Sequence, residues 1–178
     1  MLLALALWLP ASASNHSVFE VKSAQTQLIG TVYFLNADFE INLPPHIIGA
    51  FEQGFDLPLV MEVEVFQHNK YWLDKEIVMI KQKYHIQYHT LLDTVSVLNL
   101  NAGSRHYYSS LKEALASLSV LVDFPMLDKN SLTAGKKYSA RVRIGIDEAE
   151  LPVPLKTSGL WDDRWNLVSD WMEWGVNP

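Results

Sequence analysis

The sequence predicts a mainly β protein, an antiparallel β-sandwich-like single domain with one or two short helices packed on it. Two observations predict this fold. From Val18 onward, apolar and polar residues alternate in several stretches that are rich in β-branched and aromatic side chains, which is typical of strands with one buried face. Apolar residues make up 49% of the chain and charged residues 19%, which indicates a folded domain rather than a disordered segment.

The first clear strand covers Thr31–Ile41, where Tyr33 and Leu35 fall on the same face. Two prolines follow it and prevent the strand from continuing. A short helix is predicted over His46–Gln53, with Gly54 closing it.

The middle of the chain predicts a strand over Leu57–Phe66 and a longer one over Glu76–His89. A turn at Leu91–Asp93 leads into another strand, Thr94–Asn101. Because the connection is short, the last two strands are expected to pair as an antiparallel hairpin.

The clearest helix is predicted over Ser110–Leu121. Its start matches a capping box, in which the Ser110 hydroxyl accepts from the third backbone N–H and Glu113 reaches back. The apolar positions follow the i, i+3, i+4, i+7 rule of a helix laid on a sheet. They are Leu111, Ala114, Leu115, Leu118 and Leu121.

The second half continues with a strand or loop over Val120–Met126 and a strand over Lys137–Ile146. Prolines then require an extended backbone over Leu151–Leu155. No internal repeat or low-complexity linker divides the chain, so one domain over residues 14–178 is expected.

Four of the six tryptophans lie between positions 161 and 178: Trp161, Trp165, Trp171 and Trp174. A strand over Trp165–Met172 is favoured over a helix, because Asn166, Ser169 and Asp170 are weak residues for a helix interior. Core packing is the simpler explanation of these rings. An aromatic patch for a sugar, a peptide or a protein is the alternative.

The first thirteen residues predict an exported protein. Met1–Ala13 is almost wholly apolar, is interrupted by Pro10 and ends in the cleavage signature Ala11-Ser12-Ala13. Its apolar run is too short for a span, so we expect a signal peptide that is cleaved near Ala13. The segment contains no Lys or Arg, which leaves open a longer leader, and a buried N-terminal strand is the alternative. With no cysteine in the chain, the mature protein has no disulfide.

The net charge of −6 argues against binding to nucleic acid or to anionic lipid headgroups, since both require clustered Lys and Arg. It favours a basic partner. The mature chain is also expected to have no stable membrane span.

No group of residues carries a catalytic or metal-binding signature, so no catalytic residue, metal or cofactor is predicted. His85 and His89 would be about 13 Å apart on a strand, too far to share a zinc ion. Glu62 and Glu64 resemble the paired carboxylates of glycosidases only in being two acids on one face.

Several motifs resemble a bacterial family, the domain of unknown function 4390 family, over nearly all of the mature region. They are Tyr71-Trp72-Leu73-Asp74, Tyr84-x-x-x-Tyr88, Ser110-Leu-Lys-Glu113, Leu151-Pro152-x-Pro154 and the terminal run Arg164-Trp165-Asn166-Leu167-x-Ser169-Asp170-Trp171. The resemblance implies an exported proteobacterial protein of the periplasm, and a sensor histidine kinase as a possible envelope partner. It supplies no activity. Relatives tend to have a basic-aromatic-aromatic run rich in proline and arginine at this place, whereas here Tyr71 and Trp72 follow Lys70.

We therefore expect a noncatalytic periplasmic interaction module that meets an envelope protein such as a sensor histidine kinase. The candidate binding residues are Trp72, Asp74, Trp165 and Trp171. One alternative is a carrier of an apolar or aromatic small molecule. The other is a hydrolase in which Asp74 or Glu62 acts as acid or base.

Overall fold

The computed structural model of the chain describes residues 18–151 and 167–178. The predicted leader Met1–Ala13, its cleavage point and Trp165 lie outside the described residues. Within them the protein is mainly β, with two antiparallel sheets and two short α-helices, which confirms the predicted fold class.

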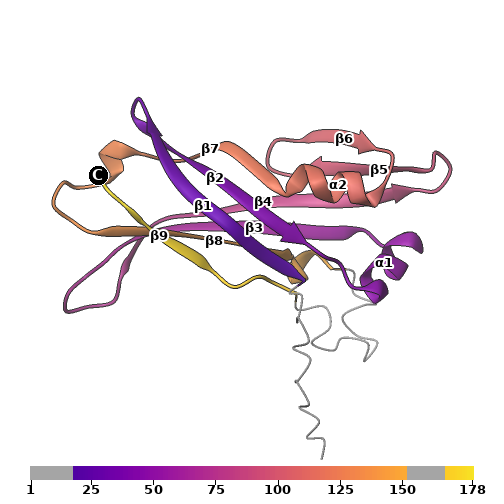
Figure 1. Cartoon of the computed structure of the whole chain (residues 1–178), viewed down its shortest axis with the longest axis horizontal. Helices are drawn as coiled ribbons and strands as arrows, with labels where there is room; N and C mark the ends of the chain where they lie inside the picture. The colour runs from indigo at the N-terminus through magenta and orange to yellow at the C-terminus, as the bar shows by residue number, and fades with distance from the viewer. Residues whose placement is uncertain (1–17, 152–166) are drawn as a thin grey trace, which may run out of the picture.

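The smaller sheet has three strands in the order β1-β2-β7, and the larger has six in the order β6-β5-β4-β3-β8-β9. Figure 1 shows both sheets. The strands are β1 Phe19–Ile29, β2 Val32–Ile41, β3 Leu57–Gln67, β4 Lys75–His89, β5 Thr94–Asn99, β6 Ser104–Tyr108, β7 Val120–Asp128, β8 Tyr138–Ile146 and β9 Met172–Val176. The α-helices are α1 Pro45–Glu52 and α2 Leu111–Leu118, and the short 3-10 turns are η1 Lys129–Ser131 and η2 Glu148–Glu150.

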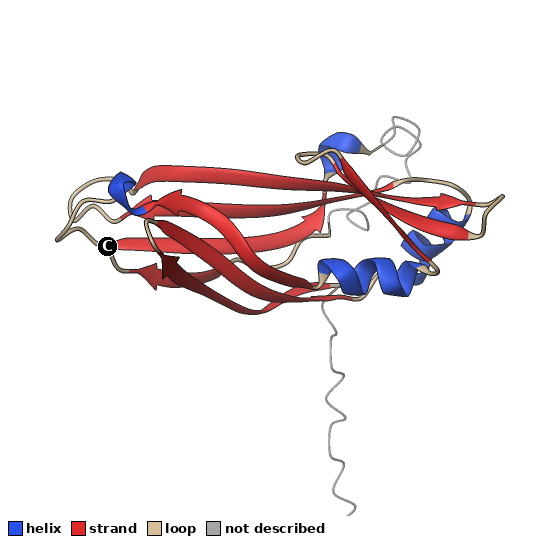
Figure 2. Cartoon of the chain, turned by 90° about the horizontal axis from the view of Figure 1, so that it is seen from above, coloured by secondary structure: helices blue, strands red, loops and turns tan. Residues whose placement is uncertain are grey.

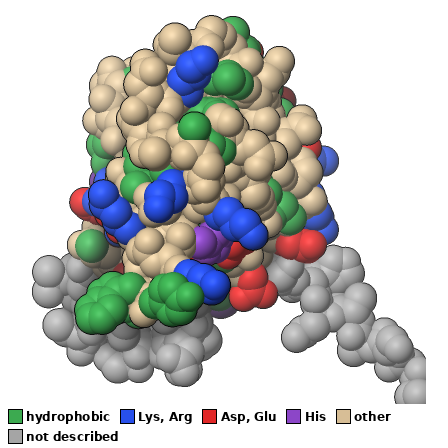
Figure 3. Space-filling model, turned by 90° about the vertical axis from the view of Figure 1, so that its left-hand side faces the viewer, with side chains coloured by type: hydrophobic (Ala, Val, Ile, Leu, Met, Phe, Trp, Pro, Cys, Tyr) green, Lys and Arg blue, Asp and Glu red, His purple; other side chains and the backbone are tan. Residues whose placement is uncertain are grey.

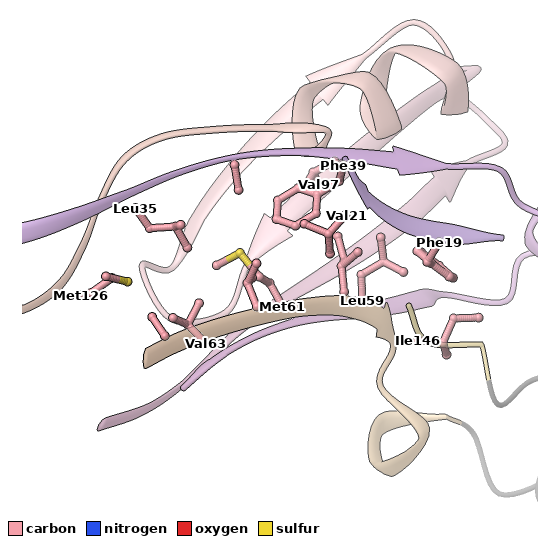
Figure 4. Close-up of a cluster of buried hydrophobic side chains, with 14 of the residues drawn as sticks. Phe19, Val21, Leu35, Phe39, Leu59, Met61, Val63, Val97, Met126 and Ile146 are labelled. Atoms are coloured by element: carbon pink, nitrogen blue, oxygen red, sulfur yellow. The ribbon is translucent and has the colours of Figure 1, made fainter. Parts of the chain in front are cut away.

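The two sheets face each other across one apolar core (Figure 2). Alternate residues of β3 point into it, and Leu59, Val63 and Val65 are almost fully buried. From the other sheet, Leu35 and Phe39 of β2 point toward them (Figure 4). The buried apolar residues of each strand therefore lie on one face, which confirms the predicted alternation with a period of two residues. Burying these faces removes apolar surface from water, which is the main favourable contribution to the free energy of folding.

Both helices lie near where they were predicted. In α1, Ile47 and Phe51 are buried, and the Phe51 ring lies 6.0 Å from that of Tyr88 on β4. The Ser110 hydroxyl caps α2 by accepting from the Glu113 N–H at 3.2 Å. Glu113 reaches back to the N–H of Ser109 rather than to that of Ser110.

The predicted helix Ser110–Leu121 is too long, because α2 ends at Leu118. The backbone carbonyl of Ser119 instead accepts a hydrogen bond from the Phe39 N–H at 2.8 Å, and Val120 begins β7 opposite Asp38. Pairing with β2 therefore ends the helix one turn early, and Leu121 belongs to the strand.

The predicted C-terminal strand is displaced toward the end of the chain. In the described part of Trp165–Met172, only an isolated bridge joins Val168 to Gly145, and regular pairing begins at Met172. From Met172 the chain continues as β9 along β8.

The bridge at Val168 depends on Gly145. A Cβ at Gly145 would lie 2.6 Å from the Leu167 carbonyl oxygen and 2.7 Å from the Val168 Cα. Two backbone hydrogen bonds join the same two segments. The Ile146 N–H donates to the Leu167 carbonyl at 2.9 Å, and the Ser169 N–H donates to the Ile144 carbonyl at 2.8 Å.

We predict that Gly145→Ala lowers the free energy of unfolding by about 1–3 kcal/mol, because the new methyl group meets backbone that must move. Denaturant unfolding followed by circular dichroism measures this. Gly49→Ala in α1 is the matched control, since a Cβ there meets nothing within 4 Å. Equal stability of the two variants would show that residues 167–169 do not approach β8 in this way.

Candidate functional site

The loop between β3 and β4 exposes three consecutive large apolar side chains. Tyr71, Trp72 and Leu73 are 85%, 84% and 83% exposed. Figure 3 looks onto this end of the molecule, where hydrophobic side chains project with Lys or Arg side chains beside them. Contiguous exposed apolar groups of this size mark interaction sites in soluble proteins.

Hydrogen bonds hold this loop in one shape. The carboxylate of Asp74 accepts from the Asn69 N–H at 3.2 Å, and the Asn69 side-chain amide donates to the Leu73 carbonyl at 2.9 Å. The His68 N–H donates to the Lys137 carbonyl at 2.9 Å, which ties the loop to the turn before β8. The apolar tip is therefore presented by a braced loop.

His68 connects Asp74 to the sheet. Its Nδ1 lies 3.1 Å from Asp74 Oδ2, and its Nε2 lies 2.8 Å from Ser139 Oγ on β8. A carboxylate only accepts hydrogen bonds, so Nδ1 donates to Asp74, while Nε2 forms the second hydrogen bond with the Ser139 hydroxyl. The candidate residue Asp74 thus acts as an anchor of the loop.

The three side chains have the order of a hydrolase triad but the opposite exposure. In a triad the acid is buried and the serine meets the substrate. Here Ser139 is 7% exposed, whereas the His68 and Asp74 side chains are 41% and 43% exposed. Ser139 also lies on a regular strand, paired with Phe66 on one side and Gly175 on the other.

The candidate residue Trp171 lies over two arginines of β8. Its ring is 4.5 Å from the Arg141 guanidinium carbon and 4.4 Å from that of Arg143. Such distances allow cation–π attraction. Trp171 is partly buried by this stacking on the outer face of the larger sheet.

The same arginines form ion pairs with β3, because Glu62 is opposite Arg143 and Glu64 is opposite Arg141 in the register. The Arg141 and Arg143 Nε atoms each lie 2.6 Å from the facing carboxylate. Lys81 of β4 reaches Glu62 from its other side. Glu62 and Glu64, the two acids that were compared with glycosidase carboxylates, therefore both form ion pairs.

Burial alone raises the pKa of the Glu62 carboxyl, but hydrogen bonds from Lys81 and Arg143 outweigh it and hold the pKa below its ordinary value. The ion pair therefore stabilises the fold at neutral pH.

A continuous strip joins Trp171 to the loop. The Phe66 ring lies 5.4 Å from the Arg141 guanidinium carbon and 5.2 Å, edge to face, from the His68 ring. We call Phe66, His68, Arg141, Arg143 and Trp171 the aromatic-basic strip. The structure thus places Asp74 and Trp171 along one side of the larger sheet, and Trp72 at the exposed tip of the loop that Asp74 holds.

Two other sequence candidates have structural partners. Trp174 of β9 donates from Nε1 to Thr26 Oγ1 of β1 at 2.5 Å, which joins the edges of the two sheets. His89 Nε2 lies 2.9 Å from Ser96 Oγ. Across residues 18–151 and 167–178, no group of three or more His, Asp or Glu side chains is placed to hold a metal ion.

Lysines cluster at the end of the molecule that carries the loop. Lys70 and Lys75 flank the apolar tip and are exposed. Lys136 and Lys137 come from the turn that the His68 N–H contacts, so they lie beside it. The whole-chain net charge of −6 therefore does not describe this end of the molecule, where exposed lysines cluster.

A groove of about 600 Å³ lies between α2 and the end of β2. Apolar side chains such as Ile41, Ile48 and Leu115 line it. It is one place that the carrier alternative could use, and it is an open surface groove rather than an enclosed pocket.

The fold and this surface define a class: a two-sheet β module that presents a braced aromatic loop. The chain matches the family model described as Domain of unknown function (DUF4390) over residues 16–175, and it belongs to that family. Neither the search of curated proteins nor that of solved structures found a match. Of the helices in the described part of the chain, none has the length and apolar character needed to cross a membrane.

We predict that Glu62→Gln lowers the free energy of unfolding by about 1–3 kcal/mol at pH 7, because it leaves Lys81 and Arg143 without their carboxylate. A lowered folded-state pKa means that this contribution is complete above the unfolded value, about 4.3, and is lost as the pH falls through the folded value.

Denaturant unfolding between pH 2.5 and 7 measures this dependence, with the exposed Glu148→Gln on η2 as control. The difference in stability between native protein and Glu62→Gln should shrink at acid pH. A constant difference would contradict the ion-pair explanation.

We predict that Asp74→Ala loosens the loop while leaving the sheets intact. The pair with His68 is exposed and contributes at most about 1 kcal/mol, so the Asn69 amide should exchange with solvent about fivefold faster while global stability changes little. Hydrogen exchange by mass spectrometry measures both, and Glu76→Ala is a nearby exposed control. Unchanged exchange over residues 69–73 would mean that Asp74 does not brace the loop.

Proposed function

We propose that this protein is a noncatalytic, exported interaction module that docks at the cell envelope through its β3–β4 loop. The observation that carries the proposal is the row of three exposed apolar side chains, Tyr71, Trp72 and Leu73, on a hydrogen-bonded loop. Exposing such groups to water is unfavourable, and docking removes that cost.

The bracing of the loop supports this proposal. A site that is ordered before binding loses less conformational entropy when it binds. Asp74 and Asn69 hold the loop, and His68 fixes it to β8, so the tip is positioned in advance. Trp and Tyr are also the residues most enriched at binding hot spots.

The proposed location is the periplasm of a proteobacterium. The apolar segment Met1–Ala13 with its Ala-x-Ala ending supports export, with cleavage near Ala13. The family resemblance supports the same compartment and suggests a sensor histidine kinase as the envelope partner.

A hydrolase is the second candidate, and the observation that favours it is the hydrogen-bonded order Ser139–His68–Asp74. The burial of Ser139 argues against it, as does its place on a strand whose backbone pairs on both sides. An oxyanion hole needs N–H donors aimed at the substrate. Hydrolysis of a short acyl ester that is lost in both Ser139→Ala and Asp74→Asn would favour the hydrolase.

We predict that a benzophenone-bearing residue in place of Trp72 forms photo-crosslinks in intact cells. The same residue in place of Leu91, which is 99% exposed in the turn between β4 and β5, is the matched control. Crosslinked products are identified by mass spectrometry of the purified chain. Adducts at position 72 and none at 91 are expected.

Equal crosslinking at the two positions, or none at position 72, would contradict docking through this loop. The Leu91 turn is suited as a control because it too is an apolar loop tip, yet it lies at the other end of the larger sheet (Figure 1).

A further inference from the structure

We propose that the docking loop contacts lipid: Tyr71, Trp72 and Leu73 enter the headgroup layer of an anionic bilayer, and the surrounding lysines face its phosphates. This inference rests on the proposed function and names what the docking loop touches. An envelope protein would then be met by other surfaces of the module while the loop end rests on the membrane.

The chemistry of the tip suits a membrane interface. Trp and Tyr concentrate at the boundary between hydrocarbon and water, where a ring can be buried while its polar edge stays hydrated. The Leu73 side chain beside them is wholly apolar. All three side chains are more than four-fifths exposed, so nothing in the described chain needs to move before they insert.

A second apolar pair lies at the same end. Leu28 and Ile29, at the tip of the hairpin between β1 and β2, are exposed large apolar residues. The β1–β2, β3–β4 and β7–β8 connections all lie at one end of the sandwich (Figure 1). The Lys129 N–H donates to the Thr31 carbonyl at 2.7 Å, which holds the first of these hairpins against the end of β7.

Five exposed lysines surround these apolar tips, and they attract anionic headgroups. They are Lys70, Lys75, Lys129, Lys136 and Lys137. Basic residues near an anionic bilayer each add to binding within about one Debye length. The acids beside these lysines are Asp74, Glu76 and Asp128; Asp74 pairs with His68, and Asp128 accepts from the Asn130 N–H.

The opposite end of the larger sheet provides an internal contrast. Leu91 and Leu92 are exposed there, but the charged residue in their turn is Asp93 rather than a lysine. An anionic surface repels that end and attracts the β3–β4 end. The combination of protruding apolar side chains with lysines therefore selects one orientation on a membrane.

The test is co-sedimentation of the processed protein, as cells release it, with vesicles of phosphatidylglycerol and phosphatidylethanolamine. Vesicles of phosphatidylcholine alone are the neutral comparison. We expect binding to the anionic vesicles that weakens in high salt. Trp72→Ala should weaken it by about tenfold, since burying a large apolar side chain is worth at least that factor.

The matched variants separate the two parts of the inference. Reversing charge with Lys136→Glu and Lys137→Glu should abolish the preference for anionic vesicles, whereas Leu91→Ala should bind as the native protein does. All the altered side chains are exposed, so circular dichroism should show an unchanged fold.

Absence of binding to anionic vesicles, or equal weakening by Trp72→Ala and Leu91→Ala, would overturn the lipid inference. If Trp72 then still crosslinks to a protein in cells, docking through the loop stands and its partner is a protein. If position 72 crosslinks to nothing and vesicles are not bound, both the proposed function and this inference fail.

Discussion

The packing of β3 against β2 is the contact on which the rest of the structure depends. One face of β3 buries Leu59, Val63 and Val65 against the smaller sheet. Its other face carries Glu62 and Glu64, which pair with arginines of β8. Because the side chains alternate, fixing the apolar face inward also fixes the ion pairs and Trp171 outward. The same strand ends at the loop that carries Trp72.

This arrangement explains how a small loop can be presented firmly. The loop joins two long strands of one sheet, and the His68 bonds to Asp74 and Ser139 fasten it to a third, β8. The hydrogen-bonded order of serine, histidine and aspartate thus has a structural role in this fold, which is to hold the loop on β8. Their order alone does not identify a hydrolase, because the nucleophile must also be accessible.

Much of the fold could be predicted from the sequence because several strands bury one face and so alternate clearly. The apolar residues of β2, β3 and β8 follow this pattern. Strand β1 was not delimited, because its second half is mostly polar and exposed, and the short β6 has too few apolar residues. The helix prediction ran into β7 because Leu121 continued the helical spacing by coincidence.

The site was only partly predictable. Trp72 and Asp74 are neighbours in a sequence motif, whereas the flanking Lys70 and Lys75 were not identified as a basic setting. Contacts between distant segments could not be predicted, because His68 and Ser139 are 71 positions apart in the sequence. Pairing of β8 with β3 brings Lys136 and Lys137 next to Lys70 and Lys75. The net charge of the whole chain gives no information about such a local cluster.

Hydroxyl-radical footprinting, performed on the purified protein and on intact cell envelopes, tests the central claim most directly. The account predicts that Tyr71 and Trp72 are oxidised rapidly in the purified protein and are protected in the envelope. Tyr107, exposed on the edge strand β6, should be oxidised equally in both samples. Equal oxidation of Trp72 in both samples would contradict the claim that this loop is where the protein docks.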